Sequence, residues 1–495
     1  MKHWVFGLAA LAAPAWAQEH HQGADDVRVA GAAHASPYAE GLYLLHNFEY
    51  GRAAEAFRRA QAADPGNVMA YWGEAMTYNH PLWAFQDRDK GRAVLARLGA
   101  TPEARKAKAR SSREAAWLEA VEMLYGEGEK RARDRDYHAR MMALHQSDPG
   151  DIDARSFAAL ATLGLAHQGR DTALYMKAAA LLEEGFAAHP DHPGVLHYLI
   201  HSYDDPAHAP LGLRAAKRYA LVAPDAGHAQ HMVSHIHLAL GDWPAVEATN
   251  VQAIKVVNAQ RAAAGRPPTW CGHYDEWLVY ALDQQGKDSR TLVANCRADA
   301  VAELAQAGDS SVLGSERSLF NNWAIVAVRH AVDTGNWPAG VALPPGDRNV
   351  LGRFELAYGR LLAARKDPAG AAAALADLRR DRTIIAAAMP RERPDDHESA
   401  AWLDRAVAQG EAVVALARGE TERGMRLLQA AADAEAALPQ PFGPPILAKP
   451  SAELLGDEYL ATGRRAEAAE AYRRALAAMP GRRASLTGIE RARGR

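Results

Sequence analysis

The sequence lacks the features that mark several large protein classes. Only two of its 495 residues are cysteine, and they are far apart, which excludes a CxxC metal or redox site. The motifs GxSxG, GxxxxGKS/T, HExxH and a helix-opening GxGxxG are also missing. Covalent hydrolase and nucleotide-binding chemistries therefore have no support in the sequence.

The charges have no strong bias either. The formal net charge is −3, the sequence pI is about 6.7, and lysine and arginine are spread along the chain. We therefore expect no nucleic-acid partner. No segment approaches the roughly 20 apolar residues that a spanning helix needs, so we expect no membrane insertion.

Residues 1–17 have the features of a secretory signal peptide. Lys2 supplies a charged start, an apolar stretch runs from Trp4 to Pro14, and a small-x-small cleavage site ends at Ala17. We expect an exported protein, periplasmic or secreted, whose mature chain begins with a flexible segment over residues 18–33.

An exported compartment permits a disulfide between Cys271 and Cys296, the two cysteines of the chain. Two cysteines without a framework carry little information about pairing. The sequence leaves this bond open.

Helical repeats of about 34 residues run from near the start of the chain to its end. A chain of 495 residues is too long for one compact core, and stacked repeats form a linear core instead. One copy has small and large packing positions at Gly41, Leu44, Ala53, Phe57, Ala60 and Pro65, and another at Leu455, Gly456, Tyr459, Ala468, Tyr472, Ala475 and Pro480. Glycines typical of turns between helices lie at 241, 286, 335, 419 and 463. These patterns predict an all-α fold, an α-solenoid of stacked helical hairpins.

The expected organisation has four parts after the N-terminal segment. They are N-terminal hairpins over 34–100, a charged helical region over 101–150, central hairpins with a histidine cluster over 151–340, and C-terminal hairpins over 341–495. Proline-bearing breaks at 344–345, 390–394 and 439–450 are interpreted as loops between repeats.

The chain resembles tetratricopeptide repeat proteins over nearly its whole mature length. The blocks HYLIHSYDDP, HAQHMVSHIHLALGDW, LLHNFEY and YNHPLW are similar to those of a bacterial exported subfamily with histidine-rich repeats. The resemblance implies a right-handed superhelix whose first helices line a concave groove. It also implies that a peptide, a protein or a small molecule binds in that groove.

Histidines recur at the repeat interval. His197 and His201 are followed 34 residues later by His231 and His235. Each pair has the spacing i, i+4, so its two rings project from one side of a helix. Adjacent helices lie about 8–10 Å apart, which allows the four imidazoles to share one metal ion.

The family-derived register adds further polar residues to the groove. His228 is a possible fifth ligand, and Asp204 is a candidate to orient an imidazole or to act in catalysis. His46, His80, His273 and Glu276 are expected to line the groove or to support the ligands. For His46, His80 and His273 a purely structural role is the alternative, because a single helical histidine is seldom a ligand.

The sequence thus favours an exported superhelix with a transition-metal site in its groove, with zinc or copper as the ion. Metal-dependent chemistry on a small substrate or peptide is compatible with this site, but the sequence does not decide whether the protein is an enzyme. The alternative is a scaffold that binds a peptide or protein and has neither metal nor catalysis.

Overall fold

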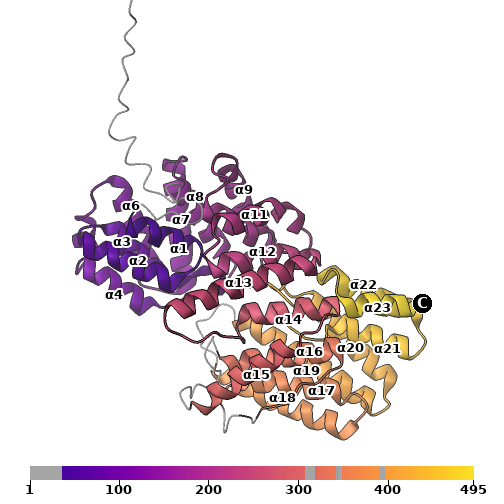
Figure 1. The fold of residues 1–495 in the computed structure, drawn as a ribbon. Helices are drawn as coiled ribbons and strands as arrows, with labels where there is room; N and C mark the ends of the chain where they lie inside the picture. Colours follow the sequence, from indigo (N-terminus) through magenta and orange to yellow (C-terminus); the bar gives the residue numbers. More distant parts are fainter. Residues whose placement is uncertain (1–35, 307–317, 342, 344–347, 389–395, 495) are drawn as a thin grey trace, which may run out of the picture.

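The computed structural model describes residues 36–306, 318–341, 343, 348–388 and 396–494. The predicted signal peptide and flexible segment, and the proline breaks at 344–345 and 390–394, lie outside these residues. Within them the chain is almost wholly α-helical, and each helix packs mainly on the helices before and after it (Figure 1). The predicted all-α solenoid is confirmed.

The helices fall into two runs along the array. The first run contains α1 (Pro37–His46), α2 (Tyr50–Ala63), α3 (Val68–Met76), α4 (Arg88–Leu98), α5 (Pro102–Lys106), α6 (Ser112–Leu124), α7 (Lys130–Ser147), α8 (Ile152–Leu163), α9 (Thr172–Ala188), α10 (Pro193–Tyr203), α11 (Ala209–Val222), α12 (Gly227–Leu240) and α13 (Trp243–Ala263). The second contains α14 (His273–Gln285), α15 (Arg290–Ala305), α16 (Leu319–Thr334), α17 (Val350–Ala363), α18 (Pro368–Ala388), α19 (Asp396–Ala417), α20 (Thr421–Ala436), α21 (Ser451–Ala461), α22 (Arg465–Ala478) and α23 (Arg483–Ala492).

Large and small residues interlock between the paired helices, as the repeat pattern predicts. A Cβ added to Gly41 on α1 would lie 2.7 Å from a ring carbon of Phe57 on α2, and one added to Gly73 on α3 would lie 2.3 Å from the same ring. Gly456 on α21 admits Tyr472 of α22 in the same way, at 2.8 Å. The close approach of these helices therefore requires glycine at the contact points.

The predicted turn glycines end or follow helices in the left-handed conformation. Gly241, Gly286 and Gly335 have φ values of 71°, 69° and 77° and are the C-caps of α12, α14 and α16. A residue with a Cβ is strained at such angles, which explains why these turns carry glycine.

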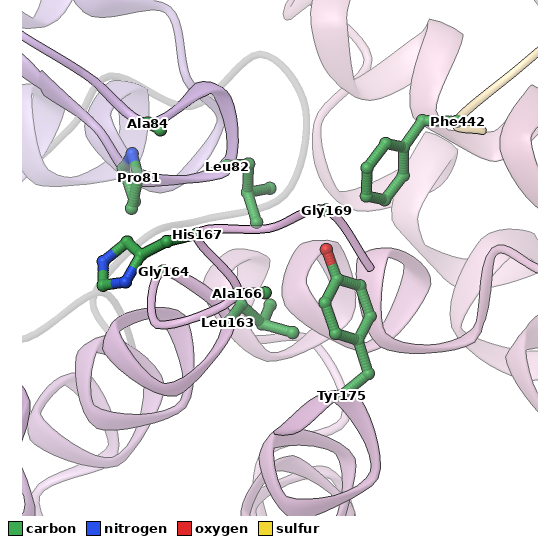
Figure 2. Close-up of a pocket in the computed structure, with 10 residues that line it drawn as sticks. All are labelled: Pro81, Leu82, Ala84, Leu163, Gly164, Ala166, His167, Gly169, Tyr175 and Phe442. Carbon is green, nitrogen blue, oxygen red and sulfur yellow. The ribbon is translucent and has the colours of Figure 1, made fainter. Parts of the chain in front are cut away.

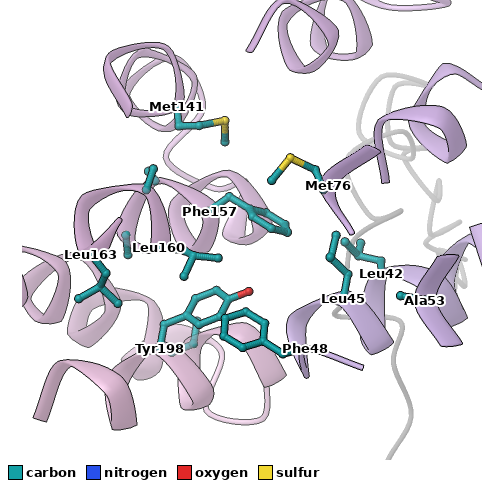
Figure 3. Packing of buried hydrophobic residues seen from close by; sticks show 14 of the residues in the cluster. Leu42, Leu45, Phe48, Ala53, Met76, Met141, Phe157, Leu160, Leu163 and Tyr198 are labelled. Atoms are coloured by element: carbon teal, nitrogen blue, oxygen red, sulfur yellow. The ribbon is translucent and has the colours of Figure 1, made fainter. Parts of the chain in front are cut away.

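Helix α10 is surrounded by more helices than an ordinary repeat helix. It packs on α8 and α12, the first helices of the neighbouring hairpins, and also on α1 from the beginning of the chain. Figure 3 shows Leu45 of α1, and Phe48 just after this helix, close to Tyr198 of α10 and Phe157 of α8. These contacts belong to a continuous apolar core that extends from Leu42 to Ala239.

Two features were not predicted from the sequence. A short antiparallel hairpin follows α3, with β1 (Asn79–His80) paired to β2 (Phe85–Gln86) around a 3-10 turn at Pro81–Trp83. In addition, α6 and α7 of the charged region pack on α3 and α8 and bury Trp117, Tyr137 and Met141 in the same core. Most of their charged side chains are at least partly exposed, but Arg133 and Asp134 of α7 are themselves buried.

The end of the chain returns to the middle of the array. Helix α23 packs on α14, and the indole N–H of Trp243 donates to the carbonyl oxygen of Gly481 at 2.9 Å. Arg482 is fully buried between Asp333 and Glu453, with ion-pair distances of 2.8 and 2.7 Å. Among the described residues, no helix is long and apolar enough to cross a membrane.

Cys271 and Cys296 form a disulfide. It links the segment before α14 to α15 and closes a loop with a sequence separation of 25 residues.

We expect the double substitution Cys271→Ser, Cys296→Ser to lower the free energy of unfolding by about 3 kcal/mol, because the cross-link restricts the unfolded chain. Denaturant titrations of both proteins measure this. Equal midpoints, or a double variant that is still sensitive to reductant, would contradict the expectation.

Candidate metal site

Three histidines from two adjacent helices converge at one point. A ligand atom of His197 and one of His201, both on α10, lie within 4.8 Å of each other and of one on His228, at the start of α12. The Nε2 atoms of His197 and His228 are 3.2 Å apart. We call these three residues the histidine triad.

The protonation of His197 follows from its partner. Its Nδ1 lies 2.6 Å from the carbonyl oxygen of His46, which can only accept a hydrogen bond. Nδ1 therefore carries the proton, and Nε2 presents its lone pair to His228. His201 is 4% exposed, and neither of its ring nitrogens has a hydrogen-bond partner. Both ring nitrogens of His201 are therefore available to a ligand.

His231 and His235 form a second arrangement one helical turn further along α12. Their Nε2 atoms are also 3.2 Å apart. Nδ1 of His231 lies 2.8 Å from Oδ1 of Asn250, and Nδ1 of His235 lies 3.0 Å from Oδ2 of Asp204. We call His231 and His235 the histidine pair.

Asp204 connects the pair to the triad. Besides His235, its Oδ2 atom lies 3.7 Å from Nδ1 of His201. The carboxylate is buried and makes an ion pair with Arg170, whose guanidinium packs between the rings of Tyr175 and Phe442 at 4.5 and 4.6 Å from their centroids. A carboxylate behind an imidazole is the usual way in which a ligand's orientation is fixed.

The pKa values favour neutral imidazoles. Burial, with a contribution from neighbouring imidazoles, lowers the pKa of His197, His228 and His231 well below 6.5, and burial lowers the pKa of His235 to about 4. Burial opposes ionisation of Asp204, but Arg170 and the adjacent imidazoles hold its pKa below the usual range. The site therefore offers neutral imidazoles beside one carboxylate, the forms that bind metal.

His46 belongs to a different kind of cluster. It forms a buried group with Asp153 and His192, in which Oδ1 of Asp153 lies 2.9 Å from His46 Nε2 and 3.1 Å from His192 Nε2. The second nitrogens also have partners, because His46 Nδ1 lies 3.1 Å from the hydroxyl of Tyr198 and His192 Nδ1 accepts from the N–H of Val195. All four ring nitrogens are satisfied, so this cluster is a structural network that supports His197 from behind.

Aromatic side chains cover the triad. Phe48 has a left-handed backbone with φ of 54°, and its ring centroid lies 4.3 Å from that of His197. A non-glycine residue at this angle is strained and is retained only where its surroundings fix it. The ring centroid of Trp83, at the 3-10 turn, lies 5.7 Å from that of Phe48 and 6.3 Å from that of His228. The residue is 48% exposed. This edge of the triad is its side toward solvent.

The remaining predicted residues lie at the periphery. His80 stacks on Tyr50 at 3.9 Å, and its Nε2 donates to the carbonyl oxygen of Thr77, away from the triad. His273 is exposed, but its ring lies 4.7 Å from that of His231. Glu276 forms an ion pair with Arg329.

The sequence analysis grouped His197, His201, His231 and His235 and added His228 as a possible ligand. In the structure His228 is a full member of the triad, while His231 lies outside it and faces His235, which in turn groups with His201 and Asp204 within 4.8 Å. Arg170, Asn250, Phe48 and Trp277 were not identified from the sequence. Only Phe48 had a signal, because it lies within the LLHNFEY block.

Two small cavities lie near the histidine site, whereas a cavity of about 490 Å³ lies away from it, between Trp243, Gln284 and Arg483. One cavity of about 40 Å³ lies between the 3-10 turn, the end of α8 and the loop that carries Phe442, and no triad histidine lines it (Figure 2). A smaller one of about 10 Å³ touches Asp204, His235 and Trp277 and is closed by Pro441 and Gly443. The loop 439–450 therefore covers the Asp204 side of the site.

Comparisons with known proteins add little to this description. No protein-family model matches the chain, and no curated protein matches it. Among solved structures, the crystal structure of the P58(IPK) TPR domain aligns over 92% of this chain and 95% of that chain, with 12% identity and a TM-score of 0.23. A likeness this loose carries no argument about function.

The buried neutral histidines predict how stability depends on pH. Unfolded histidine titrates near 6.5, whereas His235 has a pKa of about 4 in the folded protein. Below pH 6.5 the unfolded chain binds more protons, so the metal-free protein should lose stability as the pH falls toward 4, by about 3 kcal/mol from His235 alone. Denaturant titrations between pH 7 and 4 in the presence of a chelator measure this loss. His235→Gln should show a shallower decline, and parallel curves for the two proteins would contradict the prediction.

Proposed function

We propose that the protein binds a transition-metal ion at the histidine triad of His197, His201 and His228. The observation that carries the proposal is the convergence of three buried or half-buried imidazoles, in which Nε2 of His197 faces Nε2 of His228 and neither ring nitrogen of His201 has a hydrogen-bond partner. The distance of 3.2 Å between two Nε2 atoms is close to the value of about 3.3 Å expected for two nitrogens bound tetrahedrally at 2.0–2.1 Å.

The ligand type selects the metal. Neutral imidazole suits zinc and copper, and the triad contains no thiolate that would favour softer ions. Three protein ligands leave one tetrahedral position for water or a small substrate, which is the composition of many catalytic zinc sites. The exposed edge at Trp83 provides the approach to that position. Metal-dependent chemistry is thus an extension of the proposal that a substrate screen has to test.

Asp204 takes the role of a positioning residue. Its carboxylate is engaged by Arg170 and lies 3.0 Å from Nδ1 of His235, so it fixes the orientation of that imidazole, and it lies 3.7 Å from Nδ1 of His201. A carboxylate held in an ion pair with a lowered pKa is a poor general base. This differs from the catalytic role for which the sequence made it a candidate.

The alternative function is the docking of a peptide or protein without a metal. The exposed indole of Trp83 next to His228 is the observation in its favour, since exposed aromatic side chains are typical of binding surfaces.

Metal analysis distinguishes the two functions. We expect protein purified without chelator to contain zinc or copper, and the double variant His197→Ala, His228→Ala to lose the ion bound by the triad. His237→Gln is the matched control, because His237 lies on the same helix α12 but contacts Asp242 at 3.0 Å. Metal-free protein that still captures peptides through Trp83 would favour the docking function, and unchanged metal content in the double variant would refute the site.

The role of Asp204 has its own test. Asp204→Asn should weaken Zn²⁺ binding by about 10–100-fold, the usual effect of losing an orienting carboxylate, while the protein remains folded. Competition with a chromophoric chelator measures the affinity. Because Arg170 loses its closest carboxylate in this variant and is left with Asp205 at 3.6 Å, Arg170→Gln combined with Asp204→Asn controls for the altered charge balance. If the affinity is unchanged in both variants, Asp204 does not position the ligands.

A further inference from the structure

The histidine pair has lone pairs that face each other. Oδ1 of Asn250 lies opposite Nδ1 of His231, and the orientation of this amide is fixed because its Nδ2 donates to the carbonyl oxygen of Val246 at 2.8 Å. His231 therefore donates from Nδ1. His235 likewise donates from Nδ1 to the carboxylate of Asp204. In neutral rings with these tautomers, both Nε2 atoms are acceptors, and they are 3.2 Å apart.

Two acceptors at this distance repel each other unless a positive centre lies between them. A metal ion bound to both nitrogens removes the repulsion, and the spacing again matches the roughly 3.3 Å edge of a tetrahedral site with 2.0–2.1 Å bonds. Asn250 and Asp204 supply the hydrogen bonds behind the imidazoles that such ligands normally have.

A single ion cannot serve both the pair and the triad. Nitrogens bound to one ion at about 2.1 Å can be at most about 4.2 Å apart. Among the described residues, three groups of histidine and acidic residues have ligand atoms within 4.8 Å of one another. They are the triad, His46 with Asp153 and His192, and His201 with Asp204 and His235, and His231 is in none of them. The pair therefore defines a position of its own, next to the triad.

We propose that the pair of His231 and His235 binds a second transition-metal ion, so that the protein holds a two-ion centre. This inference rests on the proposed function for its first ion, but its ligands are different residues. Asp204 stands between the two positions, in contact with His235 and near His201 of the triad. The two ions share this one carboxylate as their common support.

The surroundings of the second position are asymmetric. The ring of Trp277 packs on both His231 and His235, with centroid distances of 4.6 Å in each case, and closes one side. The exposed ring of His273 lies beside His231. The second ion is thus bound by two protein ligands and is reached from the side of His273, where its other ligands come from solvent or substrate.

Zinc stoichiometry tests the second position. Chelator-stripped full-length protein is loaded with Zn²⁺, desalted and analysed for metal per chain. We expect about two ions for the wild type and for the control His237→Gln, about one for His231→Gln and about one for His228→Gln, which affects only the triad. The combination of His228→Gln and His231→Gln should bind none.

The outcomes separate the two proposals. One ion in the wild type that is lost with His228→Gln but kept with His231→Gln would overturn the second position and leave the triad intact. One ion that either variant removes would show that all five histidines share a single site, which also overturns the second position. No bound ion in the wild type would overturn both.

A measurement on the unsubstituted protein guards against variants that fail to fold. Wild-type protein loaded with Cu²⁺ should show an electron paramagnetic resonance spectrum broadened by the dipolar coupling of two nearby ions. The broadening should disappear when only one equivalent of Cu²⁺ is added. A spectrum of isolated Cu²⁺ at full loading would contradict the two-ion centre.

Discussion

The buried ion pair between Arg170 and Asp204 is the interaction on which the arrangement of the site depends. A carboxylate in the interior is costly without a cation, and removing either partner of such a pair typically destabilises a protein by about 3–5 kcal/mol. Here Asp204 also orients His235, and Arg170 is enclosed by Tyr175 and Phe442. The ion pair between Arg170 and Asp204 therefore links the C-terminal loop 439–450 to the helices that carry the histidines.

Hydrogen-bond accounting separates the histidine clusters better than proximity does. The group of His46, Asp153 and His192 is as compact as the triad, yet every ring nitrogen in it has a protein partner. In the pair, and for His197 in the triad, one ring nitrogen has a protein partner and the other points at another imidazole, while neither ring nitrogen of His201 has a partner. A ligand site and a structural network thus differ in whether the second ring nitrogen of each histidine has a protein hydrogen-bond partner. The distances between the residues alone do not show this difference.

The repeat pattern predicted the helices well because its signals are local. Gly241, Gly286 and Gly335 mark helix ends since only glycine adopts their backbone angles without strain. The i, i+4 spacing of His197 with His201 places both rings on one side of α10 whatever the rest of the fold does. The family-derived register also placed His228 near the groove, although it ranked this residue below His231.

The sequence by itself determined the helical hairpins, their order and the side of α10 and α12 on which the histidines lie, because these follow from spacing along one helix. Only the tertiary structure decided which imidazoles meet. The packing of α1 on α10 brings the carbonyl oxygen of His46 to His197, and the partners Asn250 and Arg170 come from α13 and from the loop before α9. Such contacts join residues far apart in the chain, and the regular spacing of residues in the sequence does not predict them. The tautomers of His197, His231 and His235 leave their Nε2 lone pairs free for a metal. They are fixed by the carbonyl oxygen of His46, by Asn250 and by Asp204, and so they follow from the fold alone.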